Sequence, residues 1–176
     1  GGGKSDFCHM LDLTPDGTAF AAGGASGNFY LFDVAQFIAS GQPTYSYGTG
    51  LNEAVYGVAV ASTGAMFAGV VNRGVAGAAY LISDGTAITT QFTLLRNPNS
   101  ASLNAAHGLF AIADGHPDGT PGHFYLYSGI GASPQPRPIL RWIYQTGNMS
   151  WPVVISANGS AVVGGSDDSY LYYFTA

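Results

Sequence analysis

Short apolar runs alternate with glycine-rich polar turns along the whole chain, and residues 151–174 show the pattern most clearly. Apolar runs at 151–156 and 160–163 flank Asn158-Gly159, a dipeptide suited to a two-residue hairpin turn because both residues tolerate positive φ. The polar cluster at 164–169 then separates these runs from residues 170–174, which are aromatic and suit a pleated strand. The pattern predicts strand, tight turn, strand, polar loop and strand, which is one antiparallel meander.

Two landmarks of this meander recur at a period of about 45 to 50 residues. The first is the glycine of the hairpin turn, and the second is a Tyr-Leu pair in the third strand. The glycines are Gly17, Gly64, Gly108 and Gly159, and the tyrosines of the pairs are Tyr30, Tyr80, Tyr125 and Tyr170. Because two separate landmarks keep the same period, we expect four copies of one structural unit.

A fourth, outer strand is predicted after each of the first three copies, at 44–47, 91–95 and 140–145. The segments YSYGTG and WIYQTG share the pattern aromatic-x-Tyr-x-Thr-Gly, and only residues 34–40 have a helical composition. Four strands per copy at this period are typical of a β-propeller blade. The sequence therefore predicts an all-β fold, a β-propeller forming a single domain over 1–176 with blades at about 7–47, 54–95, 101–145 and 151–174.

The copies also resemble a known repeat family. LTPDGTAFAAGGASGNFYLFD and SANGSAVVGGSDDSYLYYF are similar to the S-P-D-G-x-x-x-A-x-G-S-x-D-G-x-x-x-L-[WF] pattern of WD-repeat and pyrroloquinoline-quinone-like propellers. WIYQTG resembles the outer strand W-x-Y-x-T-G of the quinone-like group. The copies differ from WD repeats in having no Gly-His dipeptide at their start and no Trp-Asp dipeptide at their end. The resemblance implies the propeller fold, and it does not imply the activity of any one member.

Charge and composition narrow the classes of function. Five basic and ten acidic residues, with no basic cluster, disfavour nucleic-acid binding. No apolar run reaches the roughly 18 residues of a membrane helix, so no membrane span is expected. Charged residues are only 9% of the chain, and a surface with so little charge favours the association of copies. The chain opens on three glycines without a methionine, which indicates a processed product or a piece of a longer protein.

The candidate chemistry is sparse. Asp114, His116 and Asp118 lie within five residues and are candidate ligands of Ca²⁺, the one cofactor that the composition suggests. The alternative, which we expect, is a Pro/Gly turn whose aspartates bond to their own backbone. The chain has no recognisable motif of a nucleophile elbow, a zinc site or a phosphate loop, so an enzyme is not expected. Asn148 and Asn158 begin N-glycosylation sequons, and occupancy of either would place the protein outside the cell.

Counting strands predicts that the fourth blade lacks its outer strand, because only two residues follow residue 174. The segment GGGKSD before the first blade is too short and too rich in glycine to supply that strand. A bare sheet edge recruits another strand. We therefore predict an interface, covered by a second copy or by a further segment of a longer parent chain, that consists of Tyr170, Leu171, Tyr172, Tyr173 and Phe174.

These observations predict a non-enzymatic structural or protein-interaction module, an extracellular or cell-surface assembly subunit such as the repeating unit of a fibre. Two alternatives stay open. One is a quinone-dependent oxidoreductase, although the stacking Trp and the Glu/Asn/Asp metal set that the resemblance implies for such enzymes cannot be mapped onto this chain. The other is a fragment of a longer propeller whose function lies in blades outside this sequence.

Overall fold

The computed structural model describes residues 8–49, 53–72, 77–83, 88–130 and 138–176, so that GGGKSD and the start of the first predicted blade lie outside it. The fold is all-β, with 57% of residues in strands and 7% in helices. The strands form four antiparallel sheets, and no sheet closes on itself within the described residues. The prediction of an all-β chain built from antiparallel meanders is therefore confirmed.

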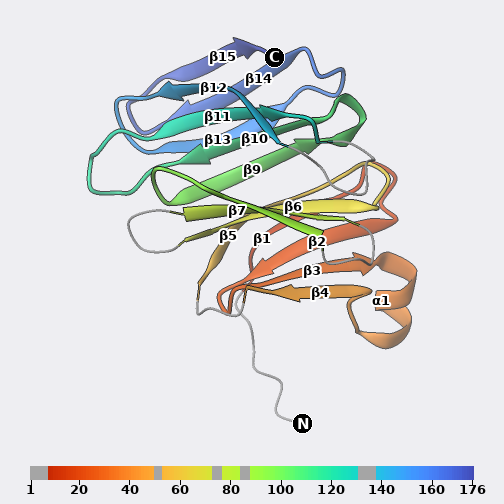
Figure 1. Ribbon diagram of the computed structural model, residues 1–176. Helices are drawn as coiled ribbons and strands as arrows, with labels where there is room; N and C mark the ends of the chain where they lie inside the picture. Colours follow the sequence, from red (N-terminus) through yellow and green to blue (C-terminus); the bar gives the residue numbers. More distant parts are fainter. Residues whose placement is uncertain (1–7, 50–52, 73–76, 84–87, 131–137) are drawn as a thin grey trace.

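Within each sheet the strands lie side by side in the order of the sequence (Figure 1). The first sheet contains β1 (Cys8–Leu13), β2 (Ala19–Gly24), β3 (Asn28–Asp33) and β4 (Tyr45–Gly48). The second contains β5 (Val55–Val60), β6 (Met66–Asn72), β7 (Gly77–Ser83) and β8 (Ile88–Thr93). The third contains β9 (Pro98–Asn104), β10 (Leu109–Asp114), β11 (His123–Ser128) and β12 (Ile139–Gln145). The fourth contains β13 (Ser150–Ile155), β14 (Ala161–Ser166) and β15 (Leu171–Thr175).

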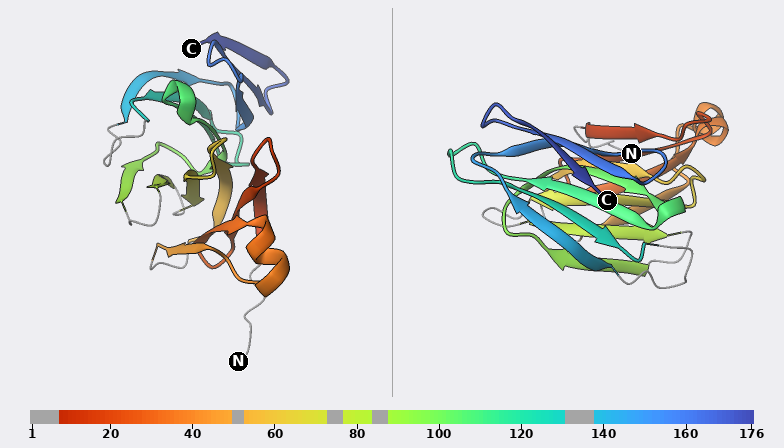
Figure 2. Two further views of the ribbon diagram at one scale, coloured as in Figure 1. Left: turned by 90° about the vertical axis from the view of Figure 1, so that its right-hand side faces the viewer. Right: turned by 90° about the horizontal axis from the view of Figure 1, so that it is seen from above.

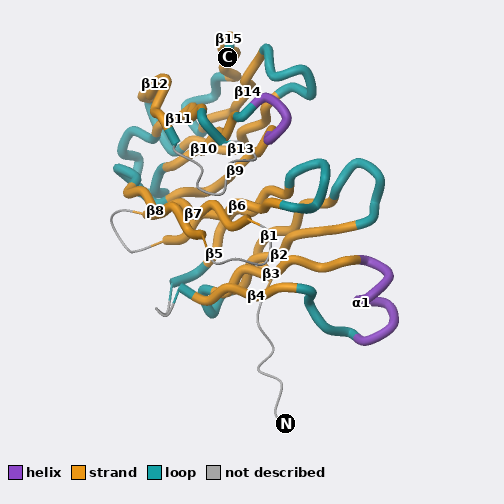
Figure 3. Tube along the Cα trace, turned by 45° about the vertical axis from the view of Figure 1, so that its right-hand side comes forward, coloured by secondary structure: helices purple, strands orange, loops and turns teal. Residues whose placement is uncertain are grey.

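The predicted helix at 34–40 is confirmed as α1 (Val34–Ser40), which projects beside the first sheet (Figure 3). The carboxylate of Asp33 accepts a hydrogen bond from the Gln36 amide at 2.8 Å and caps the start of the helix. Gly41 ends the helix in the left-handed conformation, with φ at 67°. A short 3₁₀ turn, η1 (Ala105–His107), joins β9 to β10.

All four predicted hairpin glycines lie in the turn between the first two strands of a sheet, with φ between 65° and 71°. The predicted turn type was wrong, because the residue before each glycine does not take positive φ. Instead, the Asn158 side chain accepts hydrogen bonds from the amide and hydroxyl of Ser160 at 3.1 and 2.8 Å. Asp16 accepts the same pair of bonds from Thr18 at 3.1 and 2.8 Å. These side chains hold an ordinary turn in which only the glycine is left-handed.

Two details of the predicted fourth copy were wrong. The polar cluster at 164–169 was expected to be a loop, yet Gly164 to Ser166 belong to β14. The Tyr-Leu landmark is also displaced by two residues, because Tyr172 and not Tyr170 occupies the place of the earlier tyrosines. The register shows this: Tyr30, Tyr80, Tyr125 and Tyr172 lie opposite Ala22, Gly69, Ile112 and Gly164.

The four sheets stack face to face in sequence order, with the first sheet at one end of the stack and the fourth sheet at the other (Figures 1 and 2). The first strands of successive sheets are neighbours, β1 with β5, β5 with β9 and β9 with β13. Each of the three junctions holds its own apolar cluster, centred on Phe29, Phe110 and Phe124 respectively. The core is therefore three separate layers between sheets.

At two junctions a phenylalanine of one sheet lies against a glycine of the next. A Cβ atom on Gly69 would lie 2.5 Å from Cδ1 of Phe29, and one on Gly164 would lie 2.5 Å from Cζ of Phe124. The equivalent positions of the middle junction are Ala79 and Ile112, which belong to one buried cluster. At the middle junction the small residue therefore belongs to the earlier sheet and the large residue to the later one, the reverse of the other two junctions. Each junction still pairs one large with one small residue, which keeps the packed volume similar.

Candidate functional site

The fourth sheet has three strands, and among the described residues no strand pairs with the outer edge of β15. In the part of the chain that the structure describes, this sheet therefore has one strand fewer than each of the other three. Leu171 is 78% exposed, and Tyr170 and Tyr173 are each 69% exposed. Large apolar side chains and an unpaired strand edge therefore lie together at this end of the stack.

The backbone groups on the free edge belong to alternate residues of β15. The Ala176 amide donates to the Ser160 carbonyl at 3.0 Å, and the Ser166 amide donates to the Tyr170 carbonyl at 3.2 Å, so the even-numbered residues bond towards β14. Because the amides alternate in direction along a strand, those of Leu171, Tyr173 and Thr175 point away from β14. The structure therefore presents three residues that another strand could pair with.

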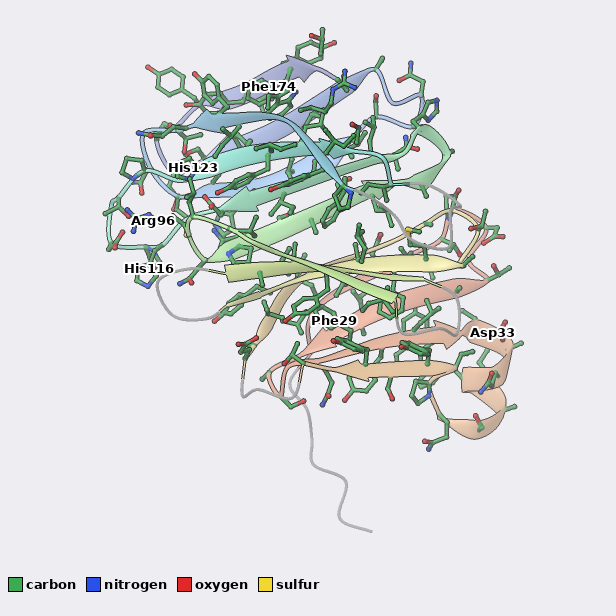
Figure 4. All side chains as sticks on the ribbon, in the orientation of Figure 1. Phe29, Asp33, Arg96, His116, His123 and Phe174 are labelled. Carbon is green, nitrogen blue, oxygen red and sulfur yellow. The ribbon has the colours of Figure 1, made fainter. Side chains whose placement is uncertain are left out.

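Side chains of β15 divide between a packed and an exposed side. Tyr172 and Phe174 face the third sheet, with Phe174 4.7 Å from the Trp142 ring and Tyr172 5.4 Å from the Tyr144 ring, measured between ring centres. We call this contact between β12 and β15 the seam, and Figure 4 places Phe174 there. An open groove of about 480 Å³ runs along the seam, lined by Trp142, Ile143, Tyr144, Tyr173, Phe174 and Thr175. Two residues of the predicted interface, Tyr173 and Phe174, therefore line a groove with one edge on β12 and the other on β15.

Asp168 stabilises this seam by hydrogen bonds to both of its sides. Its carboxylate accepts hydrogen bonds from the Tyr172 hydroxyl at 2.7 Å, the Gly147 amide at 2.8 Å and the Tyr170 amide at 3.1 Å. Desolvation raises the pKa of Asp168, but these hydrogen bonds outweigh it and hold the pKa below its usual value. The hydrogen bond to Asp168, followed by desolvation, raises the pKa of Tyr172 to about 12. The pair fixes β15 to the loop that follows β12.

The two ends of the stack expose the positions that internal sheets bury. Leu11 and Leu13 of the first sheet are 64% and 52% exposed, whereas their equivalents Val58 and Val60 in the second sheet are buried. At the other end, Leu171 occupies the place of the buried Phe29 and Phe124. Contiguous apolar faces of this kind mark sites of association.

The Ca²⁺ candidates are not brought together. Asp114 is fully buried, and it accepts hydrogen bonds from the Arg96 amide at 3.0 Å, from His123 Nδ1 at 3.0 Å and from the Tyr125 hydroxyl. His116 and Asp118 lie in an exposed turn, with 3.5 Å between Nδ1 and Oδ2. Among the described residues no three His, Cys, Asp or Glu side chains form a group that could hold a metal ion. His116 and His123 lie at the same end of the third sheet (Figure 4).

The Asp118 carboxylate serves its own turn. It accepts hydrogen bonds from the hydroxyl and, at 2.9 Å, from the amide of Thr120. The Thr120 hydroxyl, then the Thr120 amide, lower the pKa of Asp118. Desolvation opposes them in part, and the charges of His116 and Arg96 lower the pKa further. This geometry is that of the alternative interpretation, a turn whose aspartate bonds to its own backbone.

The Asp114 network was not found by sequence reasoning. Asp114 and His123 lie opposite each other at the ends of β10 and β11, and this register could have been read from the hairpin between the two strands. Burial, followed by the charge of Asp114, raises the pKa of Tyr125 and of Tyr127. The pairing of His123 Nδ1 with Asp114 fixes the orientation of the imidazole ring. The network also anchors the chain entering β9, through the amides of Leu95 and Arg96.

Both sequon asparagines lie in turns. Asn158 is exposed, and its side-chain oxygen Oδ1 accepts a hydrogen bond from the Ser160 amide within the hairpin turn. Asn148 is half-buried, and its Oδ1 accepts a hydrogen bond from the Met149 amide at 2.8 Å. Glycosylation of either residue stays a prediction.

Comparison with known proteins assigns the chain to no family. No family model matches the chain, and no curated protein matches it. No helix among the described residues is both long enough and apolar enough to cross a membrane. The resemblance to WD-repeat and quinone-like propellers therefore stays a prediction from the sequence.

Proposed function

We propose that this chain is a non-enzymatic structural and protein-interaction module of the β-propeller type, an assembly subunit of the cell surface or extracellular space. In this proposal the four sheets are consecutive blades of a larger ring or stack, and the fourth blade is completed by another polypeptide. The edge and groove at β15 form the interaction site.

The observation that carries the proposal is the match between the exposed ends and the buried junctions. Each internal sheet covers one apolar face of its neighbour, and the end sheets carry the same faces without cover. Burying a large apolar side chain is worth about 1.5 to 3 kcal/mol, so uncovered residues such as Leu11 and Leu171 give association a substantial driving force. The low content of charge leaves little repulsion to oppose it.

Analytical ultracentrifugation tests this proposal directly. We expect the chain to associate as its concentration rises over about a hundredfold range, and we expect Leu171→Glu to shift it towards monomer. The matched control is Leu95→Glu, because Leu95 is 60% exposed but lies in the connection between β8 and β9, away from both end faces. A parent protein that stays monomeric throughout, or a control variant that disrupts association as strongly as Leu171→Glu, would show that the end faces are not interfaces.

A further inference from the structure

We propose that the edge of β15 binds an extended polypeptide segment with aromatic side chains at two alternate positions, followed by Thr-Gly. This inference rests on the proposed function, in which the edge is an interaction site, and it goes further by naming the chemistry of the partner. The occupant is a single strand that becomes the fourth strand of the sheet.

Two other sheets of the chain contain the template for this strand. In the first sheet Tyr45 lies opposite Leu31 and Tyr47 opposite Phe29. In the third sheet Trp142 lies opposite Leu126 and Tyr144 opposite Phe124. In both sheets the two aromatic rings point towards the following sheet, where Tyr47 lies 6.0 Å from Tyr80 and Trp142 lies 4.7 Å from Phe174 between ring centres. In these two sheets the third strand therefore pairs with alternate aromatic residues, whereas the second sheet places Thr90 and Phe92 opposite Leu81 and Ala79.

The backbone amide at the threonine position has a separate contact, which in the second sheet Leu94 makes to the Gly77 carbonyl at 2.9 Å. The amide of Thr49 donates to the Gly27 carbonyl at 3.2 Å, and the amide of Thr146 donates to the Gly122 carbonyl at 2.9 Å. Both acceptors lie two residues before the phenylalanine of the third strand. In the fourth sheet the same place is occupied by Ser169, which takes a positive φ of 73° where Gly27 has 79°. The loop before β15 therefore has the backbone shape that receives the threonine in the first sheet.

The register then assigns each position of the incoming strand. Its first aromatic residue lies opposite Tyr173, its second lies opposite Leu171, and its threonine amide meets the Ser169 carbonyl. The intervening residue lies opposite Tyr172 and is not restricted to aromatic residues, because Ser46 and Ile143 occupy that place in the first and third sheets. The two aromatic rings would cover Tyr173 and Leu171, which are among the most exposed large apolar residues that the structure describes. The groove between β12 and β15 gives room for the strand to enter.

A synthetic peptide with the sequence of residues 139–148, ILRWIYQTGN, is a suitable probe, because it carries the complete pattern. Hydrogen exchange read residue by residue on the whole chain should show protection of the Leu171, Tyr173 and Thr175 amides when the peptide is added. The Tyr172 and Phe174 amides, which bond to β14, should be protected with and without it. The matched control peptide, ILWRYIQTGN, has the same composition with each aromatic residue moved by one position, and we expect it to bind at least about tenfold more weakly.

Two variants of the chain complete the test. Tyr173→Pro removes an amide of the free edge while leaving the bonds to β14, so it should abolish binding. Tyr173→Ser keeps the amide and loses the ring, so it should weaken binding about tenfold without a loss of strand content by circular dichroism. Equal binding of the two peptides, or protection at residues other than 171, 173 and 175, would overturn the proposal. So would edge protection that appears without peptide and rises with protein concentration, because a second copy would then hold the edge.

The outcomes separate this inference from the proposed function. A chain that associates through its end faces but ignores the peptide keeps its role in assembly and loses the assigned partner. A chain that stays monomeric but binds the peptide in register shows the reverse.

Discussion

The contact between Phe124 and Gly164 tests how the sheets are held together. Gly164→Ala would place a methyl group 2.5 Å from Cζ of the Phe124 ring, which is fully buried. β14 is paired on both sides, so it cannot move away without disturbing β13 and β15. We expect the overpacking to lower the free energy of unfolding by about 1 to 3 kcal/mol. Phe124→Ala leaves a cavity instead and should lower it by about 3 to 5 kcal/mol.

The double variant distinguishes packing from other causes. When the ring is absent the added methyl group no longer clashes and fills part of the cavity, so the double variant should be more stable than the sum of the two losses predicts, by about 1 to 3 kcal/mol. Gly69→Ala with Phe29→Ala should couple in the same way at the first junction, where the geometry is the same. The control combines Gly164→Ala with Phe29→Ala, residues of different junctions, whose effects should add within about 0.5 kcal/mol.

Equilibrium urea denaturation followed by tryptophan fluorescence measures these free energies, and Trp142 reports on the third junction because it packs against Phe174. The slope of the free energy against urea concentration should stay the same in all variants if each unfolds in one step. Additive losses for Phe124 and Gly164 would refute the view that a glycine is required there by the ring of the neighbouring sheet.

Two further predictions concern buried and bonded ionisable groups. Asp114→Ala should lower the free energy of unfolding by about 3 kcal/mol, because the donors of Arg96, His123 and Tyr125 lose their acceptor in a buried site, whereas Asp118→Ala at the exposed turn should change it little. The Tyr172 hydroxyl has a pKa raised to about 12 in the folded state. In the unfolded chain a tyrosine titrates at about 10, so this stabilising contribution should be complete below about pH 10 and lost as the pH rises to about 12. Denaturation at a series of pH values should show this loss in the parent, and Tyr172→Phe should remove the Tyr172 contribution to it.

Much of the fold was predictable because the repeat is fixed by local chemistry. The hairpin glycine needs positive φ, and only a few residue types tolerate it, so Gly17, Gly64, Gly108 and Gly159 marked four turns correctly. The turn type was wrong because the sequence alone did not show that Asp16 and Asn158 bond to residues 18 and 160. The role of Gly164 was missed for a different reason. A glycine that makes room for a ring from another sheet has the same local signature as one in a loop, and the ring belongs to a residue 40 positions earlier.

The candidate site was predictable to a similar extent. The missing strand and the exposed residues of β15 followed from counting strands, because every strand of the repeat has a fixed place. The side each residue faces did not follow, since the displaced Tyr-Leu pair suggested that Tyr170 takes the place that Tyr172 occupies. The register also decides where a proline tests the edge. Tyr172 bonds towards β14, so a proline there would damage the sheet itself, whereas the amide of Tyr173 lies on the free edge.

The junctions between sheets alternate in their chemistry, and this alternation bears on what could cover the fourth sheet. At the first junction the Asp12 carboxylate accepts from the Val60 amide at 2.8 Å, and at the third the Ser102 hydroxyl accepts from the Ile155 amide at 3.0 Å. We call the place of Asp12 and Ser102 the acceptor position. At the middle junction it is occupied by Ala59, which has no side-chain acceptor. We call the place of Phe29 and Phe124, and of the glycine each of them contacts, the packing position; at the middle junction it holds Ala79 and Ile112.

The exposed face of the fourth sheet combines features of both kinds of junction. Val154 stands at the acceptor position and offers no side-chain acceptor, as at the middle junction, whereas the residue at the packing position, Leu171, is large, as at the first and third. A sheet stacked on it needs a small residue opposite Leu171 and a first strand whose amide does not depend on a side chain from the neighbour. The first sheet meets both conditions, since it offers Ala22 at the packing position and its Leu13 amide already donates to Asp12 at 3.0 Å. We therefore expect copies to stack head to tail rather than through like faces, because the two exposed faces of one chain match in volume and in hydrogen bonding.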